Sequence, residues 1–248
     1  MWGCDFSPIV DRQLNRANAL VESQRFVPAS ELYERILVSA TDPKVVVRVQ
    51  IQLAQIYAFH LNRVFDAVTL IKKAILLTSD PKRLIKLNEI LGEIYFTNLR
   101  SFNESVNIYR ELILVKPRLS NYSEYKYRYA ESLFLSNDLS NALIVFNSLL
   151  ENSSSRNKSR IIFRIALINS FLGKIKNAED FFLKIIEGDY DYPIKVKSSF
   201  YLAGIYEDSN KLDLAHKYYS LIRYDFPNTN LINQKIKAIA QRKMEVGL

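Results

Sequence analysis

The sequence predicts an all-α protein, built as about six helical hairpins in a row and closed by one C-terminal helix. Three observations predict this fold class. Only 6 Gly and 7 Pro occur in 248 residues, fewer than the turns of a β-sandwich or barrel need. A pattern of small and bulky residues returns with a nearly constant period along most of the chain. Pairs that end in proline, which cannot continue a helix, stand where several repeats end.

The repeat starts at a small residue that is followed three positions later by a bulky one, as in Ala54 and Tyr57. A second small residue follows after about 12 or 13 positions, with a bulky residue four further on, as in Ala67 and Ile71. The six copies start at Ala17, Ala54, Gly92, Ala130, Ala166 and Ala203. Successive starts are 36 to 38 residues apart. A fixed period of this length predicts a repeat architecture.

Each copy reads as two helices that cross closely. Leu53, Ala54 and Tyr57 share one helical face, and Ala67 and Ala74 lie on the facing stripe of the next helix. Small residues at such a crossing let the two helices approach each other. The unit ends are marked by Asp42–Pro43, Asp80–Pro81, Lys116–Pro117 and Phe226–Pro227.

These elements predict three parts in chain order. Residues 1–9 form an N-terminal tail, residues 10–227 form the six repeats, and residues 228–248 form a capping helix that covers the last hairpin. The polar stretch at residues 151–157 is interpreted as a long turn between the fourth and fifth hairpins, or alternatively as a hinge.

The pattern resembles the tetratricopeptide repeat. The resemblance rests on the small residues that start and follow each copy, on the aromatics Tyr57, Tyr95 and Tyr206, and on the closing Pro117 and Pro227; the copy that starts at Ala203 matches best. It implies a tetratricopeptide-like superhelix that binds other proteins. Two features depart from the family pattern: the period is longer than about 34 residues, and Asn169 stands where an aromatic residue or leucine is expected.

Composition excludes most catalytic chemistry. With one cysteine and two histidines, the chain has few of the residues that form metal sites or catalytic triads. His60 and His216 also belong to different hairpins. Phosphate-binding and hydrolase motifs are lacking. We therefore expect no enzyme activity, no catalytic residues, no metal, no cofactor and no small-molecule substrate. No run of residues is long and apolar enough for a membrane helix.

The N-terminus suggests a cellular address. Gly3–Cys4 resembles the end of a bacterial lipobox, in which the cysteine becomes lipidated, although no apolar signal segment precedes it in this sequence. This resemblance predicts a periplasm-facing lipoprotein of the cell envelope, of the outer-membrane assembly or pilotin type. The alternatives are a free thiol on the tail and a cytoplasmic adaptor.

The resemblance also implies a binding groove lined by the first helix of each hairpin. The groove residues that it suggests, rings and cations together, are Arg48, Phe59, Lys86, Phe96, Tyr127, Arg128, Phe134, Arg160, Phe163, Phe171, Lys197 and Phe200. Such a surface suits a peptide with acidic groups, in line with the formal net charge of +8. Alternatively, some of these rings fill the core between hairpins. The carboxylate clamp of chaperone adaptors matches at only two of five positions, Asn18 and Lys86. Binding of RNA by the basic cluster at residues 156–164 is a further alternative.

Overall fold

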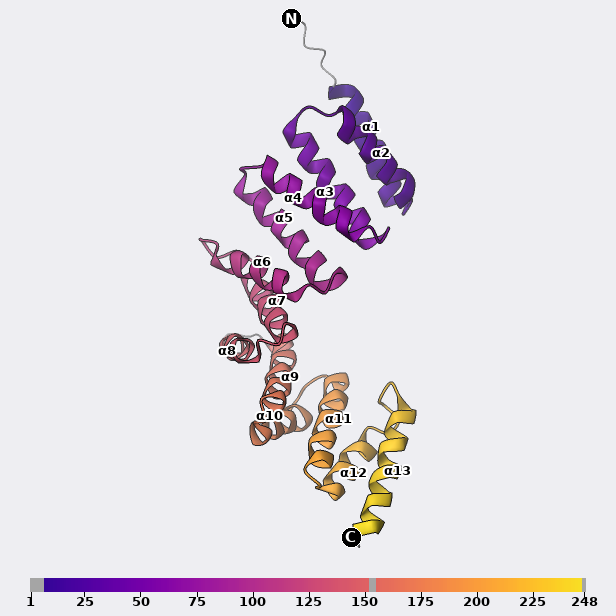
Figure 1. The fold of residues 1–248 in the computed structure, drawn as a ribbon, viewed down its shortest axis with the longest axis vertical. Helices are drawn as coiled ribbons and strands as arrows, with labels where there is room; N and C mark the ends of the chain where they lie inside the picture. The colour runs from indigo at the N-terminus through magenta and orange to yellow at the C-terminus, as the bar shows by residue number, and fades with distance from the viewer. Residues whose placement is uncertain (1–6, 152–154, 247–248) are drawn as a thin grey trace, which may run out of the picture. The chain divides into compact units, whose positions relative to one another are not determined.

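The computed structural model describes residues 7–151 and 155–246, and within these ranges all regular structure is helical (Figure 1). It comprises thirteen α-helices and one short π-helix, packed as consecutive pairs, which confirms the predicted fold class. Cys4 and residues 152–154 of the proposed turn or hinge lie outside the described residues. The chain divides into two compact units, one up to Ser132 and one from Leu133 onward.

Unit 1 contains the first three hairpins and most of the helix that follows. Its helices are α1 (Ser7–Glu22), α2 (Phe26–Ser39), α3 (Pro43–Phe59), α4 (Val64–Leu77), α5 (Pro81–Glu93) with its π-helical continuation η1 (Ile94–Asn98), α6 (Phe102–Leu114) and α7 (Tyr122–Leu135). Neighbours in sequence pack against each other from α1 to α6. The boundary between the two units falls in the last turn of α7.

Unit 2 contains the remaining helices. These are α8 (Leu139–Leu150), α9 (Ser155–Phe171), α10 (Ile175–Glu187), α11 (Tyr192–Asp208), α12 (Leu212–Leu221) and α13 (Thr229–Val246). They also pack in chain order, and α13 covers α12 as the capping helix was predicted to do. Ile232 and Ile239 of α13 are fully buried and belong to the core of unit 2.

Two of the predicted breaker pairs start helices in the expected way. Asp42 and Asp80 are N-caps whose carboxylates accept hydrogen bonds from the backbone N–H groups of Lys44, at 2.8 Å, and Lys82, at 3.0 Å. The proline that follows each aspartate occupies the first turn of the helix, where its missing N–H is not needed.

The turn inside each hairpin has one repeated geometry. The first helix of each hairpin is followed by a residue with positive φ, and these residues are Gln24, Asn62, Arg100, Asn137, Gly173 and Asn210. The N–H of the next residue then donates to a carbonyl five or six positions earlier, at 2.8 to 2.9 Å. Such a left-handed residue closes a helix C-terminus by capping carbonyls that lack a helical partner.

The small residues of the repeat lie at the helix crossings. Ala54, Ala67, Ala166, Ala178 and their counterparts in the other copies are fully buried. Gly92 shows why size matters, because a Cβ atom there would lie 3.1 Å from Ile108 Cγ2 and 3.1 Å from Tyr109 Cζ. A larger side chain would overpack the crossing between α5 and α6.

Asn169 is buried in the fifth hairpin. Its side chain is only 3% exposed, and its Nδ2 donates to the Ile165 carbonyl at 2.8 Å. A hydrogen bond to the carbonyl one turn earlier lets a polar side chain stand where an apolar one was expected. Within the described ranges, no helix has the length and apolar character needed to cross a membrane.

Candidate protein-binding site

The structure divides the predicted groove residues between the two units. Unit 1 holds Arg48, Phe59, Lys86, Phe96, Tyr127 and Arg128; unit 2 holds Phe134, Arg160, Phe163, Phe171, Lys197 and Phe200. Arg48, Lys86, Arg160 and Lys197 are exposed. Local packing separates the rings and Arg128 into those that hold the fold together and those that face solvent.

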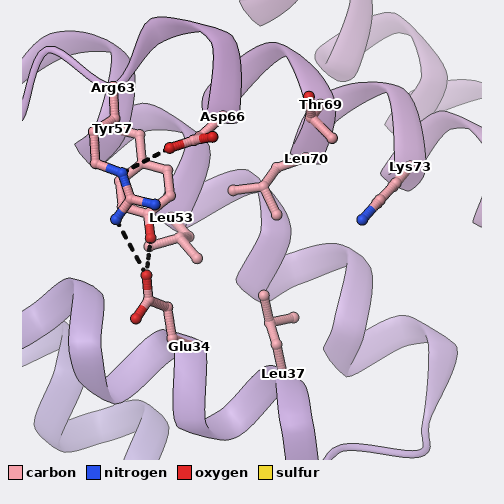
Figure 2. Close-up of a pocket in the computed structure, with 9 residues that line it drawn as sticks. All are labelled: Glu34, Leu37, Leu53, Tyr57, Arg63, Asp66, Thr69, Leu70 and Lys73. Atoms are coloured by element: carbon pink, nitrogen blue, oxygen red, sulfur yellow. Dashed lines mark hydrogen bonds and ion pairs between the residues drawn. The ribbon is translucent and has the colours of Figure 1, made fainter.

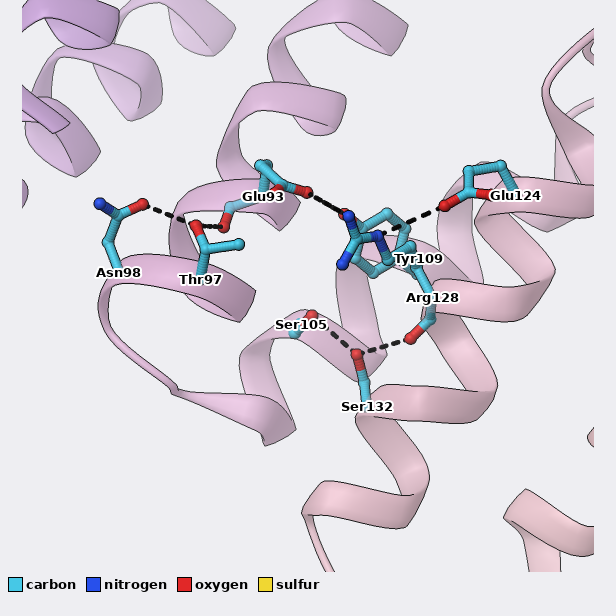
Figure 3. A network of polar contacts seen from close by, with 8 residues as sticks. All are labelled: Glu93, Thr97, Asn98, Ser105, Tyr109, Glu124, Arg128 and Ser132. Carbon is cyan, nitrogen blue, oxygen red and sulfur yellow. Dashed lines mark hydrogen bonds and ion pairs between the residues drawn. The ribbon is translucent and has the colours of Figure 1, made fainter. Parts of the chain in front are cut away.

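Arg128 holds α7 against α5 rather than facing solvent alone (Figure 3). Its guanidinium lies 3.5 Å from Glu93 and 3.6 Å from Glu124. The guanidinium also lies over the Phe96 ring, 4.7 Å from its centroid. The Tyr109 hydroxyl also donates to Glu93, at 3.4 Å. Phe96 itself is half-buried beneath this network, so neither side chain is an isolated surface anchor.

Buried hydroxyls complete the attachment of α7 within unit 1. Ser105 and Ser132 share a hydrogen bond at 2.8 Å, and Ser132 donates to the Arg128 carbonyl (Figure 3). Tyr127 donates to Glu131 at 2.7 Å, and Glu131 is only 4% exposed. Glu131 is therefore a buried acid that accepts a hydrogen bond from its own helix.

Two of the unit 2 rings pack into the core. Phe163 contacts Phe182 and Tyr201 edge to face, with centroids 5.9 and 5.7 Å apart. Phe200 stacks on Phe226 at 4.6 Å. Both belong to the shell of the unit 2 core, which matches the alternative interpretation that rings fill the space between hairpins.

Phe134 and Phe171 behave differently, because together they form an open pocket. Their centroids lie 6.0 Å apart, and the pocket of about 380 Å³ is also lined by Leu135, Asn137 and Leu139. Phe171 is 61% exposed. The Arg164 guanidinium lies 5.3 Å from the Phe134 ring, so a cation stands at the same site. The pocket lies where the left-handed turn at Asn137 joins α7 to α8.

A second pocket, of about 280 Å³, lies between α2, α3 and α4 in unit 1 (Figure 2). Its polar groups bind each other. The Tyr57 hydroxyl donates to Glu34, and Arg63 lies 3.3 Å from Glu34 and 2.7 Å from Asp66. Arg63 also stacks 3.8 Å from the centre of the Tyr57 ring. Burial and the hydrogen bond to Glu34 raise the pKa of Tyr57, which keeps its phenol protonated as a donor.

Tyrosine–glutamate pairs recur between helices, and sequence reasoning missed them. The pairs are Tyr57–Glu34, Tyr109–Glu93, Tyr125–Glu89, Tyr206–Glu179 and Tyr219–Glu207. Burial, assisted by the hydrogen bond to Glu89, raises the pKa of Tyr125 to about 12. The partners are separated by 12 to 36 residues, so no local pattern in the sequence could reveal them.

The described ranges hold no group of three or more His, Cys, Asp or Glu that could bind a metal ion. His60 stacks on Phe26 with centroids 3.6 Å apart, which gives this histidine a packing partner in the first helical turn of α2.

Comparison with known proteins identifies the architecture. A model of the tetratricopeptide repeat matches residues 159–191, which span most of α9 and all of α10. The fold is that of tetratricopeptide-repeat proteins. The matching copy is the fifth hairpin, although the sequence pattern had favoured the sixth. Tetratricopeptide-repeat proteins are typically non-catalytic scaffolds for protein–protein interaction.

Three solved structures are similar over most of this chain. A tetratricopeptide repeat protein from Parabacteroides merdae has 18% identity and a TM-score of 0.70, covering 95% of this chain and 88% of its own. PilW, a type IV pilus biogenesis factor, has 15% identity and a TM-score of 0.61, covering 94% and 98%. YrrB, a tetratricopeptide protein with an unusual peptide-binding site, has 14% identity and a TM-score of 0.59, covering 78% and 97%. No curated protein sequence matches this chain.

Proposed function

We propose that this chain is a non-catalytic scaffold that holds a partner protein, and that the pocket at Phe134 and Phe171 is the anchor point. The proposal rests on the pair of aromatic rings that lines this pocket. Phe171 leaves 61% of its surface in water beside a pocket large enough for an apolar side chain. Insertion of such a side chain would remove apolar surface of both partners from water, and buried aromatic anchors supply most of the energy at protein interfaces.

The charge of α9 indicates the chemistry of the partner. The helix carries four Lys and Arg side chains and no Asp or Glu. Arg164 stands beside the pocket, against Phe134. The partner segment is therefore expected to combine an apolar or aromatic side chain with acidic residues, because opposite charges steer the encounter and fix its register. The peptide-binding site named for YrrB supports a peptide ligand in this fold.

We further propose that the protein works at the bacterial cell envelope, facing the periplasm and anchored by a lipid on Cys4. Two observations support this address: Gly3–Cys4 resembles a lipobox, and PilW, a pilus biogenesis factor, has a similar fold. The competing proposal is a cytoplasmic adaptor that uses the same pocket.

The anchor is tested by recovery of partners from cells of the native organism. Tagged Phe171→Ala protein should recover at least about tenfold less of the specific partner than wild type, because removing an anchor ring costs roughly 2 kcal/mol of binding. Phe65→Ala is the matched control, since Phe65 is also an exposed phenylalanine, at 76% exposure, and lies on α4 in unit 1. Both variants should melt within error of wild type. Full recovery by Phe171→Ala would place the partner elsewhere.

The proposed location and lipid anchor are tested by metabolic labelling with radioactive palmitate, using the gene with its native upstream sequence. Wild type should take up the label and partition into detergent, and Cys4→Ser should do neither. Label that persists in the variant, or wild type that stays unlabelled and in the aqueous phase, would favour the cytoplasmic adaptor.

A further inference from the structure

Unit 1 presents three exposed aliphatic side chains at equivalent positions of successive hairpins. Val38, Leu76 and Leu114 are 90%, 87% and 65% exposed, and each is separated from the next by 38 residues. Each lies in the last turn of the second helix of its hairpin, α2, α4 or α6. Leu77, which follows Leu76, is also 50% exposed. Single exposed leucines are common on protein surfaces, but the same position exposed in three consecutive repeats forms a row.

Topology places this row at one edge of unit 1. The helices from α1 to α6 are joined by connections of a few residues and pack in chain order, so neighbours run in opposite directions. The turns inside hairpins therefore lie at one edge and the connections between hairpins lie at the other. Val38, Leu76 and Leu114 are the last or next-to-last residues of helices that lead into connections between hairpins.

The edge that carries the row is also the cationic edge. The segments that end the second helices, connect the hairpins and begin the next first helices are residues 33–46, 71–84 and 108–125, and they hold nine Lys and Arg against five Asp and Glu. The corresponding segments at the opposite edge are residues 16–29, 53–70 and 92–107, and they hold four of each sign. Lys72, Lys73 and Lys82, next to Leu76, are all exposed.

We infer that this edge, the row Val38, Leu76 and Leu114 with its surrounding cations, docks on an anionic membrane surface. Basic side chains are drawn to the negative headgroups of such a membrane, and exposed aliphatic side chains insert at the boundary between headgroups and acyl chains. A lipid layer deforms around single side chains that stand one hairpin apart. A folded partner would instead need a matching hollow for each of them.

Membrane contact through this edge goes beyond the proposed scaffold function and does not depend on it. The cationic edge would give a protein lipidated at Cys4 a second point of contact with the membrane. It would equally bring an unlipidated chain to the membrane, and this makes the inference separable from the state of Cys4.

The test uses the full chain as Cys4→Ser, so that no lipid can contribute. The Cys4→Ser protein without further substitutions should sediment with vesicles of phosphatidylglycerol and phosphatidylethanolamine. Its binding to pure phosphatidylcholine vesicles should be at least about tenfold weaker. Added salt should weaken the binding to the anionic vesicles, because it screens surface charge.

Two sets of variants locate the contact. The triple variant Val38→Ser, Leu76→Ser and Leu114→Ser should lose most of the bound fraction, as should Lys72→Glu combined with Lys73→Glu. The matched control is Val27→Ser, Ile144→Ser and Leu221→Ser, which removes aliphatic side chains that are 55%, 66% and 60% exposed elsewhere on the chain. The control should bind like the unmodified protein, and all variants should keep their helical circular dichroism.

Three results would overturn the inference: no sedimentation with anionic vesicles, equal binding to phosphatidylcholine, or full binding by the triple serine variant. A dimer in size-exclusion chromatography that the triple variant abolishes, without vesicle binding, would assign the row to contact between copies. These vesicles contain no partner protein. The outcome is therefore independent of whether Phe171→Ala loses its partner.

Discussion

Six residues at equivalent positions adopt the left-handed conformation that closes the first helix of each hairpin, and only one of them is glycine. Three are asparagine, which tolerates this conformation, whereas Gln24 and Arg100 gain no such advantage. The capping hydrogen bonds around Gln24 and Arg100 therefore hold the backbone of these two residues in a conformation that is disfavoured for them.

Substitutions at these turns should change stability through the backbone alone. Gly173→Ala should lower the free energy of unfolding by about 1 kcal/mol, because φ is +70° and a Cβ atom there would meet no other atom within 4 Å. Arg100→Asn should raise it by about 0.5 to 1 kcal/mol, since asparagine tolerates the same φ. Urea denaturation of the two variants measures both effects.

Gly173→Asn is the control for the alanine variant and should recover most of the lost stability. If Gly173→Ala denatures at the same urea concentration as wild type, the turn does not impose the left-handed geometry on this residue.

At the residue scale the sequence revealed which positions had to be small but not how the polar side chains pair. Ala54 and Gly92 could be identified because their period repeats. The partners of Tyr125 and Tyr219 could not, because Glu89 lies 36 residues from the first and Glu207 lies 12 from the second. The left-handed turn at Arg100 was equally hidden, since arginine carries no turn preference.

Among the elements, the capping helix α13 is attached by polar contacts as well as by its buried apolar residues. Glu207 on α11 is only 15% exposed and accepts from Lys235 of α13 at 3.0 Å and from Tyr219 of α12 at 3.1 Å. Arg242 of α13 lies 3.8 Å from the same carboxylate. One acid thus joins the last three helices of unit 2.

Glu207→Gln should loosen α13 selectively. The amide keeps the shape but removes the charge that faces Lys235 and Arg242, and since both cations are partly exposed the loss should be about 1 kcal/mol. Hydrogen exchange of α13 amides should become several-fold faster while α9 stays unchanged. Asp208→Asn removes an exposed charge one residue further along α11 and should leave α13 as it is. Equal exchange of α13 in Glu207→Gln and wild type would mean that Ile232 and Ile239 hold the cap alone.

At the scale of the whole molecule, the period of 36 to 38 residues was enough to predict the hairpins and their order. It was not enough to predict which aromatic rings are buried and which face solvent. Phe163 and Phe200, three positions before their small residues, pack into the core, whereas Phe59 and Phe171, five positions after, face solvent. The difference depends on neighbours from other helices, which a repeat pattern does not contain. The boundary between the two units inside α7 likewise depends on contacts between distant segments.

The turns inside hairpins also bear on how such a chain can grow. Each of them has three residues, or four in the second hairpin, and each keeps its left-handed residue. Connections between hairpins vary more, from three residues between α2 and α3 to seven between α6 and α7. A gene duplication whose ends fall in those connections copies an intact module. Protein engineers who wish to add a hairpin should therefore cut in the connections between hairpins and leave the turns inside the hairpins intact.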